Sequence, residues 1–217
     1  MMREHFIQKI EDVKHDILRM GGMVESIIND SVNALKEQNI DAAKKIYLDD
    51  DKIDAIELEI ENKCISLLAL QQPMAKDLRT ITTALRIIID LERMGDHAVN
   101  IAKITMEIGK EPFIKPLVDI PKMAEITQEM VKLSLDSFVN EDINLAKKVA
   151  QMDQQVDDLY EIVIRDLLNI ISSNNSAINQ VAKLMFVGRF LERIADHTTN
   201  ICERIIYMVT GELEEIN

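Results

Sequence analysis

The sequence predicts an all-α fold: six long helices arranged as two tandem, pseudo-symmetric three-helix bundles with an elongated shape. The chain has 6 Gly, 4 Pro, no Trp and 4% aromatic residues, which disfavours the frequent turns and aromatic pairs of β-sandwiches and barrels. Apolar residues recur every three or four positions along most of the chain, as in amphipathic helices. The segment LERMGDHAVNIA at 91–102 returns as LERIADHTTNIC at 191–202, which indicates an internal duplication.

The first half of the chain is expected to form three helices. Gly21 and Gly22 interrupt the apolar period of the first one and mark a place where that helix can bend. Asp41 follows a short polar turn and is a suitable cap for the second helix. After the break QQP, Pro73 suits the first turn of the third helix, which should run to Gly109. The expected helices cover residues 1–35, 41–70 and 73–109.

The second half repeats this order after a proline-rich segment. KEPFIKPLVDIP, residues 110–121, holds three of the four prolines and is the predicted boundary between the halves. Two further helices are expected at 122–138 and 143–172, and a last one runs from the polar break SSNNS to about Thr210. The predicted division is a first three-helix repeat at 1–110, a linker at 111–121 and a second three-helix repeat at 122–217.

The duplication also includes the middle helix of each half. AKKI at 43–46 matches AKKV at 146–149, 103 positions later, and a pair of acids follows both segments at the same offset. The repeated motif at 91–102 and 191–202 supplies a second pair to each half. The four pairs, each with a spacing of four residues, are Asp50 and Asp54, Glu92 and Asp96, Asp153 and Asp157, and Glu192 and Asp196.

These pairs predict cation binding. Residues four apart lie on one face of a helix, and consecutive helices joined by a short break are antiparallel neighbours. The two pairs of each half lie at nearly equal distances from the break between their helices. Four carboxylates at one level, with no Lys or Arg on the same line, form a hard oxygen-donor site, to which an Asn one turn further along adds an amide oxygen. The predicted metal ligands are Asp50, Asp54, Glu92, Asp96 and Asn100, and Asp153, Asp157, Glu192, Asp196 and Asn200.

The acid pairs also allow an interpretation other than metal binding. A single acid pair on a helix is most often a solvated surface, so the metal hypothesis depends on the match between four pairs, and a bare acidic groove that docks a basic partner remains the competing interpretation. His97 and His197 point about 100° away from the acid line, which favours a hydrogen bond in helix packing over metal ligation. Arg93 and Arg193 are expected to pair with nearby acids.

Composition limits the class of partner. A net charge of −13 and a pI near 4.8 disfavour binding to nucleic acid or to an anionic membrane, and favour cations or basic protein surfaces. Cys64 and Cys202 stand in separate helices, so we expect packing roles in a reducing compartment. No apolar run approaches 18 residues, and the N-terminal segment lacks the apolar core of a signal peptide. A cytoplasmic location is expected.

Motifs of common enzyme classes are absent from the sequence. There is no GxxxxGK[ST], no GxSxG, and no Glu three residues before His97 or His197 as in di-iron bundles. The family resemblance described below implies a non-enzymatic regulator. A metal-dependent hydrolase or oxidase that uses the same carboxylates and a metal-free helical adaptor are the alternatives.

The chain resembles the PhoU family of bacterial phosphate-uptake regulators. The resemblance is carried by QQPMAKDLRTI followed by DLERMGDHAVNIA in the first repeat, and by LERIADHTTNI in the second. It implies a cytoplasmic, often dimeric, all-α protein that lowers phosphate uptake and represses the phosphate-starvation response. The implied partners are the ATPase subunit of the phosphate ABC transporter and a sensor histidine kinase, which would hold the protein at the inner membrane without insertion.

The resemblance also implies multinuclear metal clusters at the paired E(D)xxxD motifs, which are the four acid pairs named above. It favours iron, while zinc, manganese, magnesium, calcium and nickel stay open. The two repeats are not identical. The DLR segment at 77–79 corresponds to AIN at 177–179 at the 100-residue offset. Glu57 and Glu61 continue the first acid line, and at the 103-residue offset they correspond to Tyr160 and Ile164, so they are expected either at the surface or as an asymmetry between the two sites.

Overall fold

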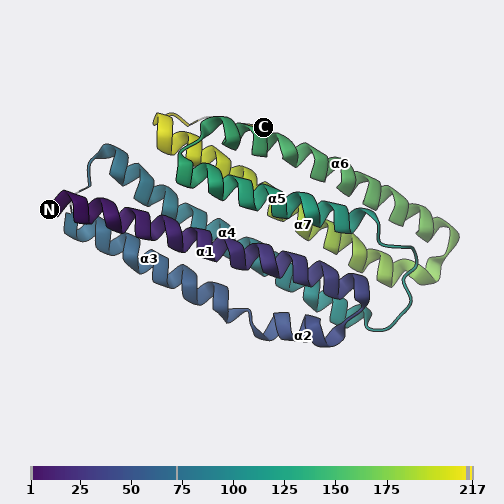
Figure 1. Ribbon diagram of the computed structural model, residues 1–217. Helices are drawn as coiled ribbons and strands as arrows, with labels where there is room; N and C mark the ends of the chain where they lie inside the picture. Colours follow the sequence, from purple (N-terminus) through teal and green to yellow (C-terminus); the bar gives the residue numbers. More distant parts are fainter. Residues whose placement is uncertain (1, 72, 214–215, 217) are drawn as a thin grey trace.

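The computed structural model describes residues 2–71, 73–213 and 216, and it confirms the all-α prediction with its six long helices. The second predicted helix consists of two pieces. A short 3-10 helix, η1, precedes the last helix. The elements are α1 (Met2–Glu37), α2 (Ile40–Leu48), α3 (Asp51–Gln71), α4 (Ala75–Ile108), α5 (Asp119–Asn140), α6 (Ile143–Ser173), η1 (Asn175–Ala177) and α7 (Ile178–Thr210) (Figure 1).

The two repeats pack along their length and share one hydrophobic core. The long helices lie roughly parallel to one another, with α1 beside α5 and α4 beside α7 at the junction of the repeats (Figure 1). The junction is pseudo-symmetric and antiparallel: Arg79 Nε of α4 donates to Met208 O near the end of α7 at 3.0 Å, and Lys183 Nζ of α7 donates to Glu107 O near the end of α4 at 2.8 Å. Among the described residues, no helix is long and apolar enough to span a membrane.

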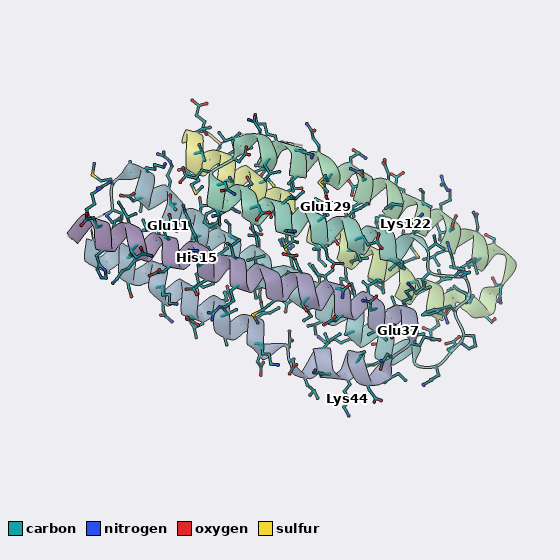
Figure 2. The ribbon with its side chains drawn as sticks, in the orientation of Figure 1. Glu11, His15, Glu37, Lys44, Lys122 and Glu129 are labelled. Atoms are coloured by element: carbon teal, nitrogen blue, oxygen red, sulfur yellow. The ribbon has the colours of Figure 1, made fainter. Side chains whose placement is uncertain are left out.

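Apolar residues at the helical period form the shared core. The predicted inner positions of both motif copies are fully buried, among them Leu91, Met94, Leu191 and Ile194. Charged side chains such as Lys44 lie on the outer surface of the bundle (Figure 2). Both cysteines are buried and free, as expected for packing residues.

The second predicted helix is interrupted, which corrects the prediction of one helix over 41–70. α2 ends at Leu48, Asp49 and Asp50 form a turn, and α3 begins at Asp51. Three consecutive Asp side chains compete for backbone N–H groups and favour helix ends over helix interiors. The counterpart in the second half is MDQ at 152–154, and α6 runs through it without a break. One predicted ligand, Asp50, therefore lies in a turn while its counterpart lies in a helix.

Several helix ends differ from the predictions in detail. Asn39, rather than Asp41, caps α2, because its side chain accepts the Ala42 N–H at 3.0 Å. α4 begins at Ala75, two residues after Pro73, and ends before Gly109, whose φ of 64° favours glycine. α5 begins at Asp119, three residues earlier than predicted.

α1 is a single helix through Gly21 and Gly22, and the two glycines differ in surroundings. A Cβ atom at Gly21 would overlap the Cδ1 atom of Leu135 in α5, whereas a Cβ at Gly22 would meet nothing within 4 Å. Gly21 therefore permits the close approach of α1 and α5 that joins the repeats, while Gly22 is exposed.

The linker is docked on the second repeat. Gln180 of α7 is 2% exposed, accepts the Ile114 N–H at 2.8 Å through Oε1 and donates to Pro112 O at 3.1 Å through Nε2. Lys115 pairs with Asp166 of α6 at 2.7 Å. In the first repeat the counterpart of Asp166 is Lys63, which pairs with Asp16 of α1 at 2.7 Å. The linker thus covers, in the second repeat, the end that the longer α1 covers in the first.

Gln180→Leu is expected to destabilise the protein by about 1 to 3 kcal/mol, because it leaves the Ile114 N–H and the Pro112 carbonyl without their partner. Urea unfolding measures the change. Gln155→Leu, the same substitution at an exposed position of α6, should change stability by no more than about 0.5 kcal/mol. Equal stability of the two variants would show that linker docking contributes nothing.

Candidate functional site

The first acidic cluster lies between α3 and α4. Asp50 in the turn before α3 and Asp54 in α3 are close enough to Asp96 and Glu92 of α4 for their charges to interact. Burial, then the charges of Asp96 and Asp54, raise the pKa of Asp50. Burial, then the charge of Asp96, raise the pKa of Glu92 to about 7. The helical hairpin thus brings together the acids of the two pairs, as the spacing predicts.

The second cluster, between α6 and α7, is more deeply buried. Asp153 is 7% exposed and Glu192 is 9% exposed, although both carry carboxylates. Burial raises the pKa of Asp153 to about 7, with further contributions from the charges of Asp157 and Asp196. Burial, then the charge of Asp196, also raise the pKa of Asp157 and of Glu192. The four acids of the two helices again lie close enough for their charges to interact.

Arginines compensate part of this negative charge, as predicted for Arg93 and Arg193. Arg93 Nη1 lies 3.1 Å from Asp96 Oδ2, and its Nε lies 3.3 Å from Glu92 Oε2. Arg193 Nη1 lies 3.3 Å from Asp196 Oδ2. Each arginine therefore compensates part of the negative charge of the acid pair on its own helix.

Two further cations correct the expectation that no Lys or Arg shares the acid line. Arg189, one turn before Glu192, donates to its Oε1 atom. Lys103 donates to Asn100 Oδ1 at 3.2 Å and lies 5.3 Å from the ring centre of Tyr47. The amide oxygen of Asn100 is thus engaged by an ammonium group, while its counterpart Asn200 is half-buried on α7. Neither cation has a counterpart of the same charge in the other repeat.

The fit of a metal ion depends on the donor set. In the described part of the chain, no three His, Cys, Asp or Glu side chains converge as they would around a metal ion. Asp153 Oδ1 and Glu192 Oε2 are nevertheless buried without a hydrogen-bond partner, and Arg193 Nε is 4.0 Å from the latter. Buried carboxylate oxygens without donors are costly unless a cation meets them. The second cluster fits a hard cation by this criterion, and the ligand assignment stays a prediction.

The two histidines differ. His197 Nδ1 lies 2.9 Å from Asp90 Oδ1 of α4, which confirms the expected hydrogen bond between helices. His97 lacks one: its Nδ1 is buried without a partner, and its ring stacks on Phe190 at 5.6 Å between centres. Burial, then the charge of His197, lower the pKa of His97 to about 4. The prediction for His97 was wrong because Phe190, far away in sequence, takes the place of a polar partner.

Glu57 lies beside the first cluster, which favours the predicted asymmetry between the two sites over the surface role. It is half-buried one turn beyond Asp54, and its charge contributes to the raised pKa of Glu92. Its i+3 spacing from Asp54 is the signal that places it on the first acid line in the sequence. Its counterpart Tyr160 packs against the core. In the second repeat the next residue, Glu161, adds its charge to the burial and the charge of Asp196 that raise the pKa of Asp157.

Comparison with known proteins agrees with this architecture. The PhoU domain matches residues 17–105 and 120–205, one match for each repeat. The chain belongs to the PhoU family. A "Phosphate-specific transport system accessory protein PhoU homolog" of Clostridium acetobutylicum is 42% identical over 218 residues and covers 100% of both chains. A PhoU homolog of the same description from Pseudomonas aeruginosa is 37% identical, over 96% of this chain and 86% of its own length.

Solved PhoU structures have the same fold. The crystal structure of PhoU from Pseudomonas aeruginosa has a TM-score of 0.90 and 38% identity, and covers 95% of this chain and 100% of that chain. The phosphate transport system regulatory protein PhoU from Streptococcus pneumoniae has a TM-score of 0.90 and 28% identity, over 96% of this chain and 99% of that chain. The six-helix PhoU architecture is therefore shared along the chain.

Within this PhoU fold, the DLR segment has an intramolecular role. Asp77 Oδ2 lies 3.7 Å from Arg3 Nη2 of α1, and Arg79 connects α4 to α7 through the Met208 carbonyl. Both contacts join α4 to helices that reach the same end of the bundle. At the 100-residue offset, Ala177 cannot form the ion pair and Asn179 has no guanidinium group to donate the hydrogen bond, which accounts for the difference between the repeats in this segment.

Proposed function

We propose that this chain is a non-enzymatic, cytoplasmic regulator that lowers phosphate uptake through a phosphate ABC transporter and represses the phosphate-starvation response. The main support is the full-length similarity to relatives named accessory proteins of the phosphate-specific transport system. The ATPase subunit of the transporter and a sensor histidine kinase are the proposed partners. The net charge of −13 fits a protein that docks on basic protein surfaces.

Metal binding at the two acidic clusters is part of this proposal. Asp50, Asp54, Glu92 and Asp96 would hold one site or cluster, and their counterparts in the second repeat the other. A bound cation would neutralise the carboxylates and connect the two helices of each hairpin. Iron is favoured by the family. The support from this chain is the donor set and the two buried carboxylate oxygens without hydrogen bonds.

Complementation tests the regulatory role. The chain is expressed in a bacterium that lacks its own PhoU protein, and a phosphate-starvation reporter and the rate of phosphate uptake are measured in high phosphate. We expect both to fall to the level of the parent strain. A folded, abundant protein that leaves both unchanged would contradict the proposal.

We also propose a homodimer. Leu58 and Ile65 of α3 lie on one face, seven residues apart, and each is half exposed or more. L58E together with I65E is expected to convert the dimer to a monomer in sedimentation equilibrium, because buried charges oppose association. The control is the pair K44E and K122E, at exposed positions outside this face. A wild-type monomer, or a double variant that still dimerises, would exclude this face.

A further inference from the structure

A pocket at the junction of the repeats has a chemistry distinct from that of the acidic clusters. It lies between α4 and α7, which are neighbours in the bundle (Figure 1). Its volume is about 420 Å³, within the usual range for small-molecule sites. None of the acids of the two clusters lines it. The side chains that matter are Thr83 and Arg86 of α4, and Glu203, Arg204 and Tyr207 of α7.

Two guanidinium groups meet in this pocket, in a chain with 25 basic and 38 acidic residues. Arg86 is exposed and forms no hydrogen bond or ion pair with any described residue. Arg204 Nε is buried without a hydrogen bond, 3.6 Å from Asp90 Oδ2. The other oxygen of Asp90 is bound to His197. Both arginines thus keep donors available, and the planar guanidinium group matches two oxygens of a tetrahedral oxyanion.

Neutral and acidic groups complete the pocket. The Thr83 hydroxyl and the Tyr207 phenol can each donate a further hydrogen bond. Glu203 accepts the Ile216 N–H through Oε1 at 3.1 Å, which leaves its second oxygen as an acceptor. A carboxylate repels a fully ionised anion, but it accepts a hydrogen bond from an anion that keeps a proton. At neutral pH orthophosphate keeps at least one proton, whereas sulfate keeps none.

The duplication does not repeat the two arginines of this pocket. At the 100-residue offset, Arg86 corresponds to Phe186, Arg204 to Ile104 and Tyr207 to Glu107. Only the two arginines are replaced there by aromatic and apolar residues, with Phe186 stacked on Phe190 at 6.4 Å between ring centres. Lys183 and Lys103 stand where the pocket has Thr83 and Glu203. The duplication does not account for the arginines, so the arginine pair is a specific feature of one side of the junction.

We propose that this pocket binds one inorganic phosphate per chain, with Arg86 and Arg204 as the main donors and Glu203 as the acceptor that selects a protonated oxyanion. This inference extends the proposed regulatory function by giving the chain a direct phosphate site. It is independent of metal at the acidic clusters.

Calorimetric titration of the full chain with orthophosphate at pH 7 tests the inference. A chelator is present, so that phosphate cannot bind through a metal ion. We expect one phosphate per chain, with affinity at least tenfold weaker in Arg86→Gln and in Arg204→Gln. The control Arg165→Gln removes the same charge from an exposed position of α6 and should bind as the wild type does. Absence of phosphate binding, or equal binding by Arg86→Gln, would overturn the proposal.

Arg86→Gln is the decisive variant, since Arg86 has no partner whose loss could unfold the chain, and circular dichroism confirms its helix content. Titrations with sulfate and with glycerol phosphate, which has no acidic proton left at pH 8, test the ligand class. Orthophosphate should bind at least tenfold more tightly than sulfate, and Glu203→Gln should strengthen sulfate binding. Equal affinity for sulfate, or tighter binding of glycerol phosphate at pH 8, would refute the assignment to free phosphate.

Experiments can exclude the regulatory function and the phosphate pocket independently of each other. Complementation by a chain that binds no phosphate would overturn this inference alone. Phosphate binding by a chain that does not complement would overturn the proposed function and leave the site intact.

Discussion

Asp153→Asn is expected to stabilise the metal-free protein at pH 8 by on the order of 2 to 4 kcal/mol. Burial, followed by the charge of Asp157, raises the pKa of Asp153 from 3.8 to about 7 in the folded protein. Each tenfold difference in proton affinity corresponds to about 1.4 kcal/mol. The charged carboxylate therefore destabilises the fold at pH 8, and a neutral amide removes that cost.

The stability gained from Asp153→Asn should depend on pH in one direction. A carboxyl whose pKa is raised on folding binds a proton more tightly in the folded than in the unfolded state. Its contribution to stability is therefore lost as pH rises from about 4 to about 7, and is constant above that. The gain from Asp153→Asn should be largest above pH 7 and should shrink steadily below it.

Urea unfolding in the presence of a chelator, from pH 5.5 to pH 8.5, measures how much Asp153→Asn changes the free energy of unfolding. Asp158→Asn is the matched control, because Asp158 is an exposed acid on the same helix, and its effect should stay within about 0.5 kcal/mol at every pH. A gain from Asp153→Asn that does not change with pH would show that the buried carboxylate carries no unfavourable charge in the folded state.

Gly21→Leu is expected to destabilise the protein by about 3 kcal/mol or more, whereas Gly22→Leu should stabilise it by about 0.5 to 1 kcal/mol. Leucine is a better helix former than glycine at both positions. Only at Gly21 does the new side chain overlap a neighbour, the buried Leu135 of α5, and overpacking of a core is costly. The sign of the effect therefore depends on the contact between the repeats.

Thermal and urea unfolding of the two variants provide the comparison, with each glycine serving as the control for the other. Gly21→Ala should lie between wild type and Gly21→Leu, because the end of the Leu135 side chain can move. If both leucine variants were stabilised alike, α1 and α5 would not be in the close contact that joins the repeats.

The sequence predicted the helices and the acid pairs because both depend on local periodicity. A duplicated motif and a helical hairpin are enough to place Asp54 near Glu92. The turn at Asp49 and Asp50 could have been found from the run of three Asp residues, which MDQ at 152–154 does not share. Its effect on the first cluster is to place one predicted ligand outside a helix.

Features that depend on contacts between the repeats could not be predicted in this way. Phe190 replaces a polar partner of His97 only because α4 and α7 pack in antiparallel orientation. The docked linker depends on Gln180, and the phosphate pocket depends on Arg86 and Arg204, which are separated by more than half of the chain. No local pattern marks any of these pairs before the two repeats are assembled.

Metal content measured by elemental analysis tests most directly whether the acids of each repeat form a metal site. Protein is incubated with iron, manganese or zinc and then freed of unbound ions. The first variant is D50N, D54N, E92Q and D96N, the second is D153N, D157N, E192Q and D196N, and the third combines them. The control is D12N, D30N, E129Q and D158N, four exposed acids.

We expect stoichiometric metal in the wild type and in the control. Each of the first two variants should lose the metal bound by the substituted repeat, and the third should bind no metal. Circular dichroism should show unchanged helix content throughout. A wild type that retains no metal, or a third variant that retains as much as the wild type, would contradict the claim.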